Sequence, residues 1–450
     1  MRGMRDLAQD NWNGLEGLEG RLMLDGAVAG SVSGGYLNLK GDLWGNQIAL
    51  DQAGLLPGQV RVSGVNGTLV RVKGVFYAEY IFQNVTRGAK IRLSGGDDAA
   101  DLNSLNLAGN LLVDGGKGDN TIRVTGGNFL KAVTLKNSTG SSYVDINGAG
   151  VAGQTKIYNG DGNQSVILTG TFDQPLYIKN GYGSHSVTLD GADFESVRID
   201  NRPGDSTTVI NNTTFLRNLG VYNRWGADSL AITATTVAGR VTIDNGQGAS
   251  DTSITGSDIN TGFDWRRPRS LYLVSDGGYD SVAVDNTTFG GDVWLDTGWD
   301  GSDIALGNSS FAGQLWIDTY SGQDNISLTN IGVDGRLDIY TGEGADQVSI
   351  DDSDFGGFAG IQTGWGNDQI YIETAGAADG PRTTFAGSVD FYMGGDDDDL
   401  VIGVAGQSGN LAAFNGYSTV FDGGWGDNAL SDSTDNQYAH DPYIFSFHLV

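Results

Sequence analysis

Aspartates that follow glycine-rich loops at a fixed spacing are the residues of this chain with the clearest capacity for chemistry. The segments "TGEGADQVSI" and "TGWGNDQIYI" place Asp346 and Asp368 22 residues apart, and Asp324 lies 22 residues earlier. If each segment forms one coil of a stack, these carboxylates lie about 4.8 Å apart. Like charges at that distance raise one another's pKa or hold a cation between them. Calcium takes oxygen ligands at about 2.3–2.6 Å, so an ion between coils could reach two carboxylates.

More acids lie toward the C-terminus, in "GGDDDDL" and "GGWGDN". The alternative to a metal site is that these aspartates cap turns through backbone amides and stay solvated. The residues that we expect as calcium ligands are Asp324, Asp346, Asp368, Asp396, Asp398 and Asp427.

These loops resemble the calcium-binding nonapeptide of repeats-in-toxin proteins, G-G-x-G-x-D-x-U-x. In that family the motif recurs every 9 residues, whereas here it comes once in 22, so the resemblance implies a sparser arrangement of Ca²⁺ sites. The matching positions are Gly342, Gly344, Asp346, Val348, Gly364, Gly366, Asp368 and Ile370.

Aromatic residues form a second candidate site, for a sugar or a protein partner. The triplets "LYL", "VWL" and "LWI" alternate, so their central rings should point away from the core. Exposed aromatic patches commonly mark binding surfaces. The alternative is that the rings stack on one another, shield strand edges or lie under the insertion at 263–269. The ligand-binding candidates are Tyr272, Trp294 and Trp316 in the triplets, and Trp299, Tyr320 and Trp365 in the adjoining loops.

Arginines supply the only candidates for catalysis. Polysaccharide lyases with a β-helical fold pair a basic residue with calcium on an acidic sugar, which is an analogy of fold alone. Neither a Ser/His/Asp arrangement nor a phosphate loop nor a histidine metal motif is present. We therefore assign no catalytic residue to the leading function. A polyuronate lyase is the alternative, with a base among Arg202, Arg224, Arg266, Arg267 and Arg269.

The elements that position these residues repeat with a period of 22. The first apolar residue of each V-x-I triplet recurs at intervals of 21 or 22, with two intervals of 30 at insertions near "GFDWRRPRS" and "AGAADGPRT". Alternating triplets indicate strands with one buried face. Repeated units of two or three short strands predict an all-β fold, a single-stranded parallel β-helix of about 14 coils. The starting residues are Ile122, Val144, Val166, Val187, Thr208, Leu230, Thr252, Val282, Ile304, Ile326, Val348, Ile370 and Leu400.

Phenylalanines recur at one phase of the repeat and should stack inside the rod as a ladder. They are Phe129, Phe172, Phe194, Phe215, Phe289, Phe311 and Phe355. The ends lack the repeat, which predicts four regions. These are a disordered leader (1–25), an N-terminal β cap or irregular first coils (26–93), the β-helix (94–430) and a C-terminal cap or tail (431–450).

Composition excludes several classes of protein. The chain has 450 residues, no cysteine and a formal net charge of −29. It therefore has no disulfide, thiol nucleophile or cysteine metal site, and its field repels nucleic acid and attracts cations. No run of 18 apolar residues appears, so we expect no membrane span.

The segment "LEGLEGRLMLDG" (15–26) resembles the Leu-Glu-Pro-Arg-x-Leu-Leu leader of large planctomycete surface proteins, with Gly20 in place of proline. The repetitive body, such as "LNLAGNLLVDGGKGDNTIRVTGGNF", is similar to their β-helical regions. The resemblance implies an extracellular or cell-surface location. The expected function is a structural or adhesive, calcium-stabilised rod that binds extracellular polysaccharide or cell-surface components and associates through its coil ends.

Calcium in the millimolar range is expected to raise the melting temperature, and chelator to lower it. An ion that binds only the folded rod adds about 2.7 kcal/mol at a hundredfold excess over Kd. Magnesium should stabilise less, because it demands a tighter octahedral shell. The double variant Asp346→Asn/Asp368→Asn should lose much of the calcium effect and keep the fold. A melting temperature indifferent to calcium and chelator at low ionic strength would reject these ligands.

Overall fold

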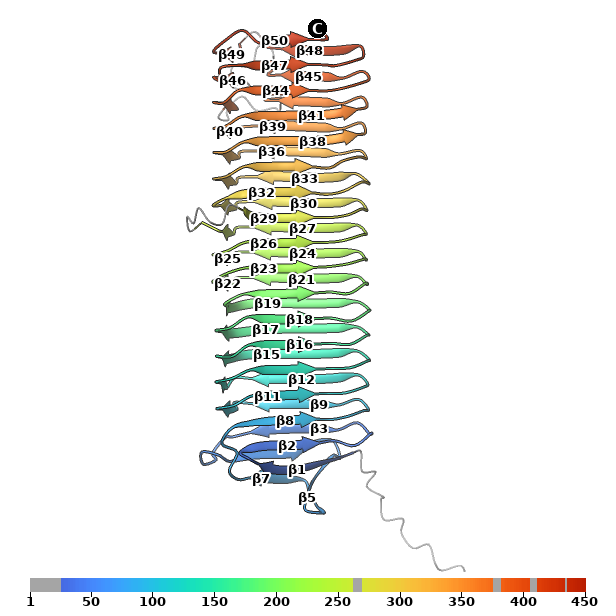
Figure 1. The fold of residues 1–450 in the computed structure, drawn as a ribbon, viewed down its shortest axis with the longest axis vertical. Coiled ribbons are helices and arrows are strands. Elements are labelled where there is room, and N and C mark those ends of the chain that lie inside the picture. The colour runs from blue at the N-terminus through green and yellow to red at the C-terminus, as the bar shows by residue number, and fades with distance from the viewer. Residues whose placement is uncertain (1–25, 262–268, 375–381, 405–410, 434) are drawn as a thin grey trace, which may run out of the picture.

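The chain forms a long rod of stacked coils (Figure 1). The computed structural model describes residues 26–261, 269–374, 382–404, 411–433 and 435–450. Within these residues every regular element is a strand, and the strands pair into one sheet of 20 and one of 31. The coils make about 15 turns with a spacing near 22 residues. The prediction of an all-β parallel β-helix is confirmed.

Three strands make up a typical coil, and each strand pairs in parallel with its counterpart one coil away. The coil containing β30 (Asp280–Asp285), β31 (Thr288–Phe289) and β32 (Asp292–Asp296) is an example. Val282 pairs with Ile304, 22 residues later, as the triplet spacing predicts. Apolar residues at alternate positions of each strand are therefore brought into continuous columns inside the rod.

The strands fall into three series, one for each side of the coil. In three coils the first and second sides form one long strand. The first series is β9 (Ala99–Asn103), β12 (Asn120–Thr125), β15 (Ser142–Val151), β17 (Gln164–Phe172), β19 (His185–Phe194), β21 (Ser206–Asn211), β24 (Asp228–Thr233), β27 (Ser250–Thr255), β30, β33 (Ser302–Gly307), β36 (Asn325–Thr329), β39 (Gln347–Asp351), β42 (Gln369–Ile372), β45 (Asp399–Ile402), β48 (Asn428–Asp432) and β51 (Phe447–Leu449).

The second series contains strands of two residues. It is β10 (Asn106–Leu107), β13 (Asn128–Phe129), β22 (Thr214–Phe215), β25 (Thr236–Val237), β28 (Asp258–Ile259), β31, β34 (Ser310–Phe311), β37 (Gly332–Val333), β40 (Asp354–Phe355), β43 (Thr384–Phe385), β46 (Ala413–Phe414) and β49 (Gln437–Tyr438).

The third series carries both of the surface sites described below, and we call its outer surface the third face. It is β8 (Gly88–Arg92), β11 (Leu111–Asp114), β14 (Val133–Lys136), β16 (Thr155–Tyr158), β18 (Leu176–Lys179), β20 (Val197–Asp200), β23 (Leu219–Tyr222), β26 (Val241–Asp244), β29 (Arg269–Val274), β32, β35 (Leu315–Asp318), β38 (Leu337–Glu343), β41 (Ala359–Trp365), β44 (Val389–Tyr392), β47 (Thr419–Asp422) and β50 (Tyr443–Phe445).

The N-terminal region combines a first coil with antiparallel ribbons. β2 and β3 stack in parallel on β8 and β9, whereas β1 pairs with β2, β4 with β3 and β7, and β6 with β5 in antiparallel fashion. Antiparallel pairing occupies strand edges at this end and so limits edge-to-edge association. These strands are β1 (Ala27–Ser33), β2 (Tyr36–Lys40), β3 (Gln47–Asp51), β4 (Val60–Gly64), β5 (Leu69–Val72), β6 (Val75–Tyr77) and β7 (Glu79–Phe82).

The repeat continues further toward the C-terminus than the sequence pattern indicated. Leu400 pairs with Leu430, which reveals a third 30-residue interval. Within the residues at 435–450, β49, β50 and β51 then stack in parallel on β46, β47 and β48. The segment assigned to a cap or tail thus adds a further coil in the same register.

Phenylalanines form the expected ladder, in segments. All seven predicted members are buried. Phe172 stacks on Phe194 with ring centres 4.8 Å apart, and Phe289 on Phe311 at 5.1 Å. Val237 and Ile259 occupy the same column between these segments. Because interiors are packed at near-crystalline density, the column tolerates a change of side chain and still excludes voids.

Asparagines form a second column inside the rod. The side-chain amide of Asn159 donates to Asn180 Oδ1 at 2.9 Å, Asn180 to Asn201 at 2.8 Å, and Asn201 to Asn223 at 2.9 Å. All four are buried. Each side-chain N–H group therefore has an acceptor in the next coil. This removes the free-energy cost of burying an unpaired polar group.

Replacing Phe311 with alanine is expected to destabilise the rod by about 3–5 kcal/mol, because it deletes a fully buried ring and leaves a cavity. Leu216→Ala is the matched control, since Leu216 is 65% exposed and its loss should change stability by less than about 0.5 kcal/mol. Urea unfolding followed by circular dichroism measures both. Equal effects would contradict the interior ladder.

Candidate functional site

The glycine-acid loops deliver their aspartates to the interior of the rod. Asp324, Asp346, Asp368 and Asp398, here called the aspartate column, are each at most 1% exposed. The backbone N–H of Asp324 donates to Asp346 Oδ1, that of Asp346 to Asp368, and that of Asp368 to Asp398, all at 2.9 Å. The expected stacking is confirmed: Asp346, Asp368 and Asp398 each accept a backbone amide from the neighbouring coil, whereas Asp324 accepts the hydroxyl of Thr319.

One oxygen of each column carboxylate is buried without a hydrogen-bond partner among the described residues. Burial raises the pKa of Asp324 and Asp398 to about 7 and that of Asp368 to about 6, and it also raises the pKa of Asp346. Repulsion by the neighbouring carboxylate adds to the rise at Asp324 and Asp398. Both effects disfavour the charged form, so the column takes up protons near neutral pH.

The other two expected calcium ligands lie elsewhere. Asp396 and Asp427 are exposed, and Asp427 lies 3.4 Å from His448 Nδ1. Among the described residues, three carboxylates come within 4.8 Å of one another at Asp351, Asp352 and Glu373. Glu373 Oε1 already accepts the backbone N–H groups of Asp352 and Thr383. Four of the six predicted calcium ligands thus lie inside the rod and two lie on its surface. Calcium binding stays a prediction.

The outward triplet rings stack along the rod on the third face. Trp294 and Trp316 lie parallel with centres 4.7 Å apart, and Tyr340 continues the stack at 4.9 Å from Trp316. The guanidinium of Arg269 lies 5.3 Å from the rings of both Tyr272 and Trp294. Ring faces inside this stack are therefore covered by other groups, and free faces arise only where the stack ends.

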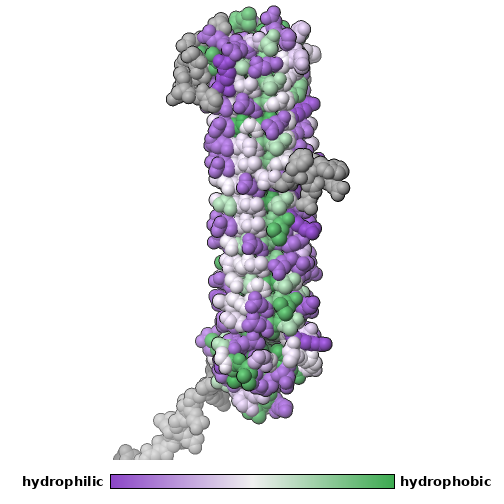
Figure 2. Space-filling view, turned by 90° about the vertical axis from the view of Figure 1, so that its left-hand side faces the viewer, coloured by the Kyte–Doolittle hydropathy of each residue, from purple (hydrophilic) through white to green (hydrophobic). Residues whose placement is uncertain are grey.

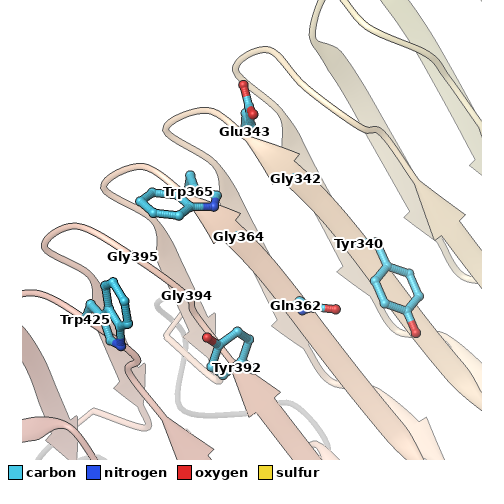
Figure 3. Close-up of a pocket in the computed structure, with 10 residues that line it drawn as sticks. All are labelled: Tyr340, Gly342, Glu343, Gln362, Gly364, Trp365, Tyr392, Gly394, Gly395 and Trp425. Carbon is cyan, nitrogen blue, oxygen red and sulfur yellow. The ribbon is translucent and has the colours of Figure 1, made fainter.

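The stack ends at a groove, where Gln362 follows Tyr340 in the next coil. This aromatic groove, of about 420 Å³, is lined by Tyr340, Gln362, Trp365, Tyr392 and Trp425 (Figure 3). Tyr340, Gln362 and Tyr392 stand on three successive strands of the third face, whereas Trp365 is the last residue of β41 and Trp425 lies in the loop after β47. A second hollow of about 460 Å³ shares Tyr340, Gln362 and Tyr392, so the groove extends across the face.

Two tryptophans rise from the groove's loop edge with a glycine between them. Trp365 pairs with Gly395 in the next coil, and Gly395 pairs with Trp425. The tryptophan side chains are 63% and 78% exposed. A side chain at 395 would meet the Trp365 ring at 3.2 Å. The missing side chain keeps the space between the two indoles open.

Glycine forms the floor of this groove because the loops pack backbone to backbone. Gly364 and Gly394 have φ values of +104° and +98°, which favour glycine. A Cβ at Gly394 would lie 1.8 Å from the carbonyl oxygen of Gly364. The floor therefore consists of main chain, and the groove walls are the side chains that flank it.

The remaining aromatic candidates lie outside this groove. Trp299 stacks on Tyr320 with a centre distance of 6.1 Å and an interplanar angle of 2°. Of the six predicted ligand-binding residues, only Trp365 lines the groove. Tyr340, Tyr392 and Trp425 were not among the predicted residues, although Trp425 follows Trp365 by two 30-residue intervals at the same position of the repeat.

The arginines separate into two places. Arg202 and Arg224 line a common cavity of about 430 Å³ on the third face, whereas Arg269 lies over Tyr272 and Trp294. Arg266 and Arg267 lie outside the described residues. The structure therefore brings two of the five candidate bases together, and it places them several coils from the Trp294–Trp316 stack.

No family model, curated protein or solved structure matches this chain. In the part of the chain that the structure describes, no helix has the length and apolar character to cross a bilayer.

The melting temperature is expected to fall as pH rises from about 4 to 7. Asp324, Asp368 and Asp398 have native pKa values of about 6–7, above the unfolded value of about 3.9, and the pKa of Asp346 is raised as well. The folded rod thus binds more protons in this window, and stability present at pH 4 is lost as the pH passes through the native pKa.

The double variant Asp324→Asn/Asp398→Asn should flatten this pH dependence and keep the fold, because Asn428 occupies the same column and its Oδ1 accepts the Asp398 amide at 2.9 Å. Asp427→Asn, at an exposed position, is the matched control. An unchanged slope in the double variant would show that the column does not titrate with folding.

Proposed function

We propose that this protein is an extracellular structural or adhesive rod that binds an extended, uncharged polysaccharide in the aromatic groove. The observation that carries the proposal is the pair of exposed tryptophans beside open tyrosine faces, above a floor of glycine backbone. Aromatic rings offer flat apolar surfaces, and the amide of Gln362 offers a donor and an acceptor for hydroxyl groups.

The charge of the groove supports a neutral ligand. Glu343 is its one charged lining residue among those described. In the adjoining hollow, Arg336 and Asp338 pair at 2.5 Å and so neutralise each other, which leaves Asp390 and Asp422. An acidic sugar would therefore meet net negative charge here, whereas an uncharged one would not.

The shape of the rod supports a polymer as the ligand. The residues that line the groove and the adjoining hollow come from β38, β41, β44, β47 and β50 and the loops beside them, and these strands follow one another along the axis of the rod. On the side of the rod that carries the second series, which faces the viewer in Figure 2, a separate band of apolar residues also runs along the axis. A chain molecule laid along such a surface makes several weak contacts at once, which suits adhesion.

Location and calcium dependence complete the proposal. The leader resemblance supports an extracellular or cell-surface setting, and the glycine-acid loops support stabilisation by Ca²⁺, tested by the melts described above. A polyuronate lyase on this scaffold is not favoured by the groove, because none of the three predicted bases that the structure describes, Arg202, Arg224 and Arg269, lines it.

Trp365→Ala/Trp425→Ala is expected to weaken binding of neutral polysaccharides by tenfold or more, because stacking of a ring on an aromatic side chain contributes about 1 kcal/mol or more per contact. Affinity gel electrophoresis against dextran, xylan, β-glucan and galactomannan identifies a bound polymer, and calorimetry with its oligomers measures the change.

Trp44→Ala is the matched control, since Trp44 is exposed and lies in the N-terminal region, away from the groove. It should bind as tightly as the unaltered protein. Absence of binding to every polymer, or equal losses in the control and the double variant, would reject the groove as the binding site.

A further inference from the structure

A cluster of cationic side chains lies on the third face, about five coils from the aromatic groove. Lys179, Arg198, Arg202 and Arg224 line one cavity of about 430 Å³ together with Trp225. We call this the arginine site. It is a local concentration of positive charge in a chain whose formal net charge is −29.

The repeat itself does not explain Arg202 and Arg224. They occupy the same loop position in adjacent coils, where Gly246, Gly342 and Gly364 stand in other coils with φ between +65° and +104°. Neither arginine has a positive φ, and neither do Gly160 and Gly181 at this position in the two preceding coils, so the backbone here accommodates residues other than glycine. Like charges on directly adjacent strands are destabilising, and a bound anion would offset this cost.

Protein carboxylates supply this compensation only in part. Asp200 is engaged, since it pairs with Arg198 at 2.8 Å and accepts the Tyr177 hydroxyl at 2.6 Å. Among the described residues, no carboxylate comes within 4.0 Å of the charged atoms of Arg202, Arg224 or Lys179. In the part of the chain that the structure describes, these three cations thus have no ion pair within 4.0 Å, and Asp244 and Asp276 line the same cavity at longer range.

Aromatic rings border the same cations. The Arg198 guanidinium lies 3.9 Å from the Tyr222 ring centre, and the Arg202 guanidinium lies 5.7 Å from that of Tyr182. Trp225 is 62% exposed at the rim. Guanidinium groups bind planar or tetrahedral oxyanions through paired N–H groups, and an exposed indole accepts the face of a sugar ring.

We infer that the arginine site binds an anionic sugar, with its carboxylate or sulfate between Arg202 and Arg224 and its ring against Trp225. Asp244 and Asp276, which also line the cavity, accept hydroxyl protons of the same sugar. Although the whole chain is acidic, charges beyond about 10 Å are screened at 0.1 M salt. Within the cavity, four cationic side chains stand against the carboxylates of Asp200, Asp244 and Asp276.

The arginine site and the aromatic groove serve different ligands. Asp296 and Asp318 lie at the outer edge of the third face between the two sites, in the column that contains Asp244 and Tyr340. A polyanion running along the axis would meet these carboxylates. We therefore treat the two sites as independent, and the inference does not rest on the proposed function.

Calorimetry of the full chain with oligogalacturonate, dextran sulfate and uncharged dextran tests the site. The expected result is binding of one or both anionic probes, weakened at least tenfold by Arg202→Ala/Arg224→Ala. Stronger binding of oligogalacturonate assigns a carboxylate ligand, and stronger binding of dextran sulfate assigns a sulfate ligand. Arg202→Lys/Arg224→Lys keeps the charge but loses the paired N–H groups, so its affinity should be intermediate.

The matched control is Arg123→Ala/Arg217→Ala, which removes the same charge from arginines that are paired with Asp101 and Glu195. This control and the groove variant Trp365→Ala/Trp425→Ala should bind the anionic probe as the unaltered protein does. If Arg202→Ala/Arg224→Ala and Arg123→Ala/Arg217→Ala lose affinity equally, binding depends only on the overall charge of the chain, and the inference is overturned. Failure of the unaltered chain to bind either anionic probe would overturn it as well.

Discussion

Parallel backbone pairing in register, coil on coil, is the constraint on which the rest of this structure depends. Hydrogen bonding between coils fixes the axial spacing at about 4.8 Å and places each residue on its counterpart in the next coil. Each side chain therefore meets another of the same position rather than a complementary partner from a distant segment. A residue type can therefore fill a column only if identical side chains, stacked one coil apart, attract one another or satisfy one another's hydrogen bonds.

Residue types meet this condition in different ways. Phenylalanine rings stack, as Phe289 and Phe311 do, and asparagine amides donate and accept along one line. Charged aspartates repel one another at this spacing, yet aspartate occupies four successive coils in the aspartate column. There all four carboxyls have a raised pKa; three of them accept a backbone amide, and Asp324 accepts the hydroxyl of Thr319. Protonation removes the repulsion between these carboxylates. The contribution of the aspartate column to stability therefore depends on pH, whereas that of the phenylalanine and asparagine columns does not.

The sequence predicts the fold well because the constraint is periodic. Triplets such as Val348–Ile350 carry both the spacing and the direction of the buried face. The same alternation also places Asp346 inward, since residues 346, 348 and 350 share one face, and Asp346 is buried. The sequence analysis treated that aspartate as a loop residue instead. The third 30-residue interval and the matching positions of Trp365 and Trp425 were not predicted. Insertions lengthen the sequence spacing between equivalent residues but leave the register of the strands unchanged.

Binding surfaces are harder to predict, because they arise where a column changes its residue type. Trp294 and Trp316 stack in one column, and the Trp316 ring also lies 4.9 Å from Tyr340 of the neighbouring column, so aromatic residues in register cover one another's faces. Gln362 follows Tyr340 in its column and leaves a tyrosine face uncovered, and Gly395 separates two indoles. Arginine in place of loop glycine likewise turns a backbone-packed position into one with unpaired charge. In a rod built by repetition, the strand columns explain stability, whereas function is to be sought at the residues that interrupt them.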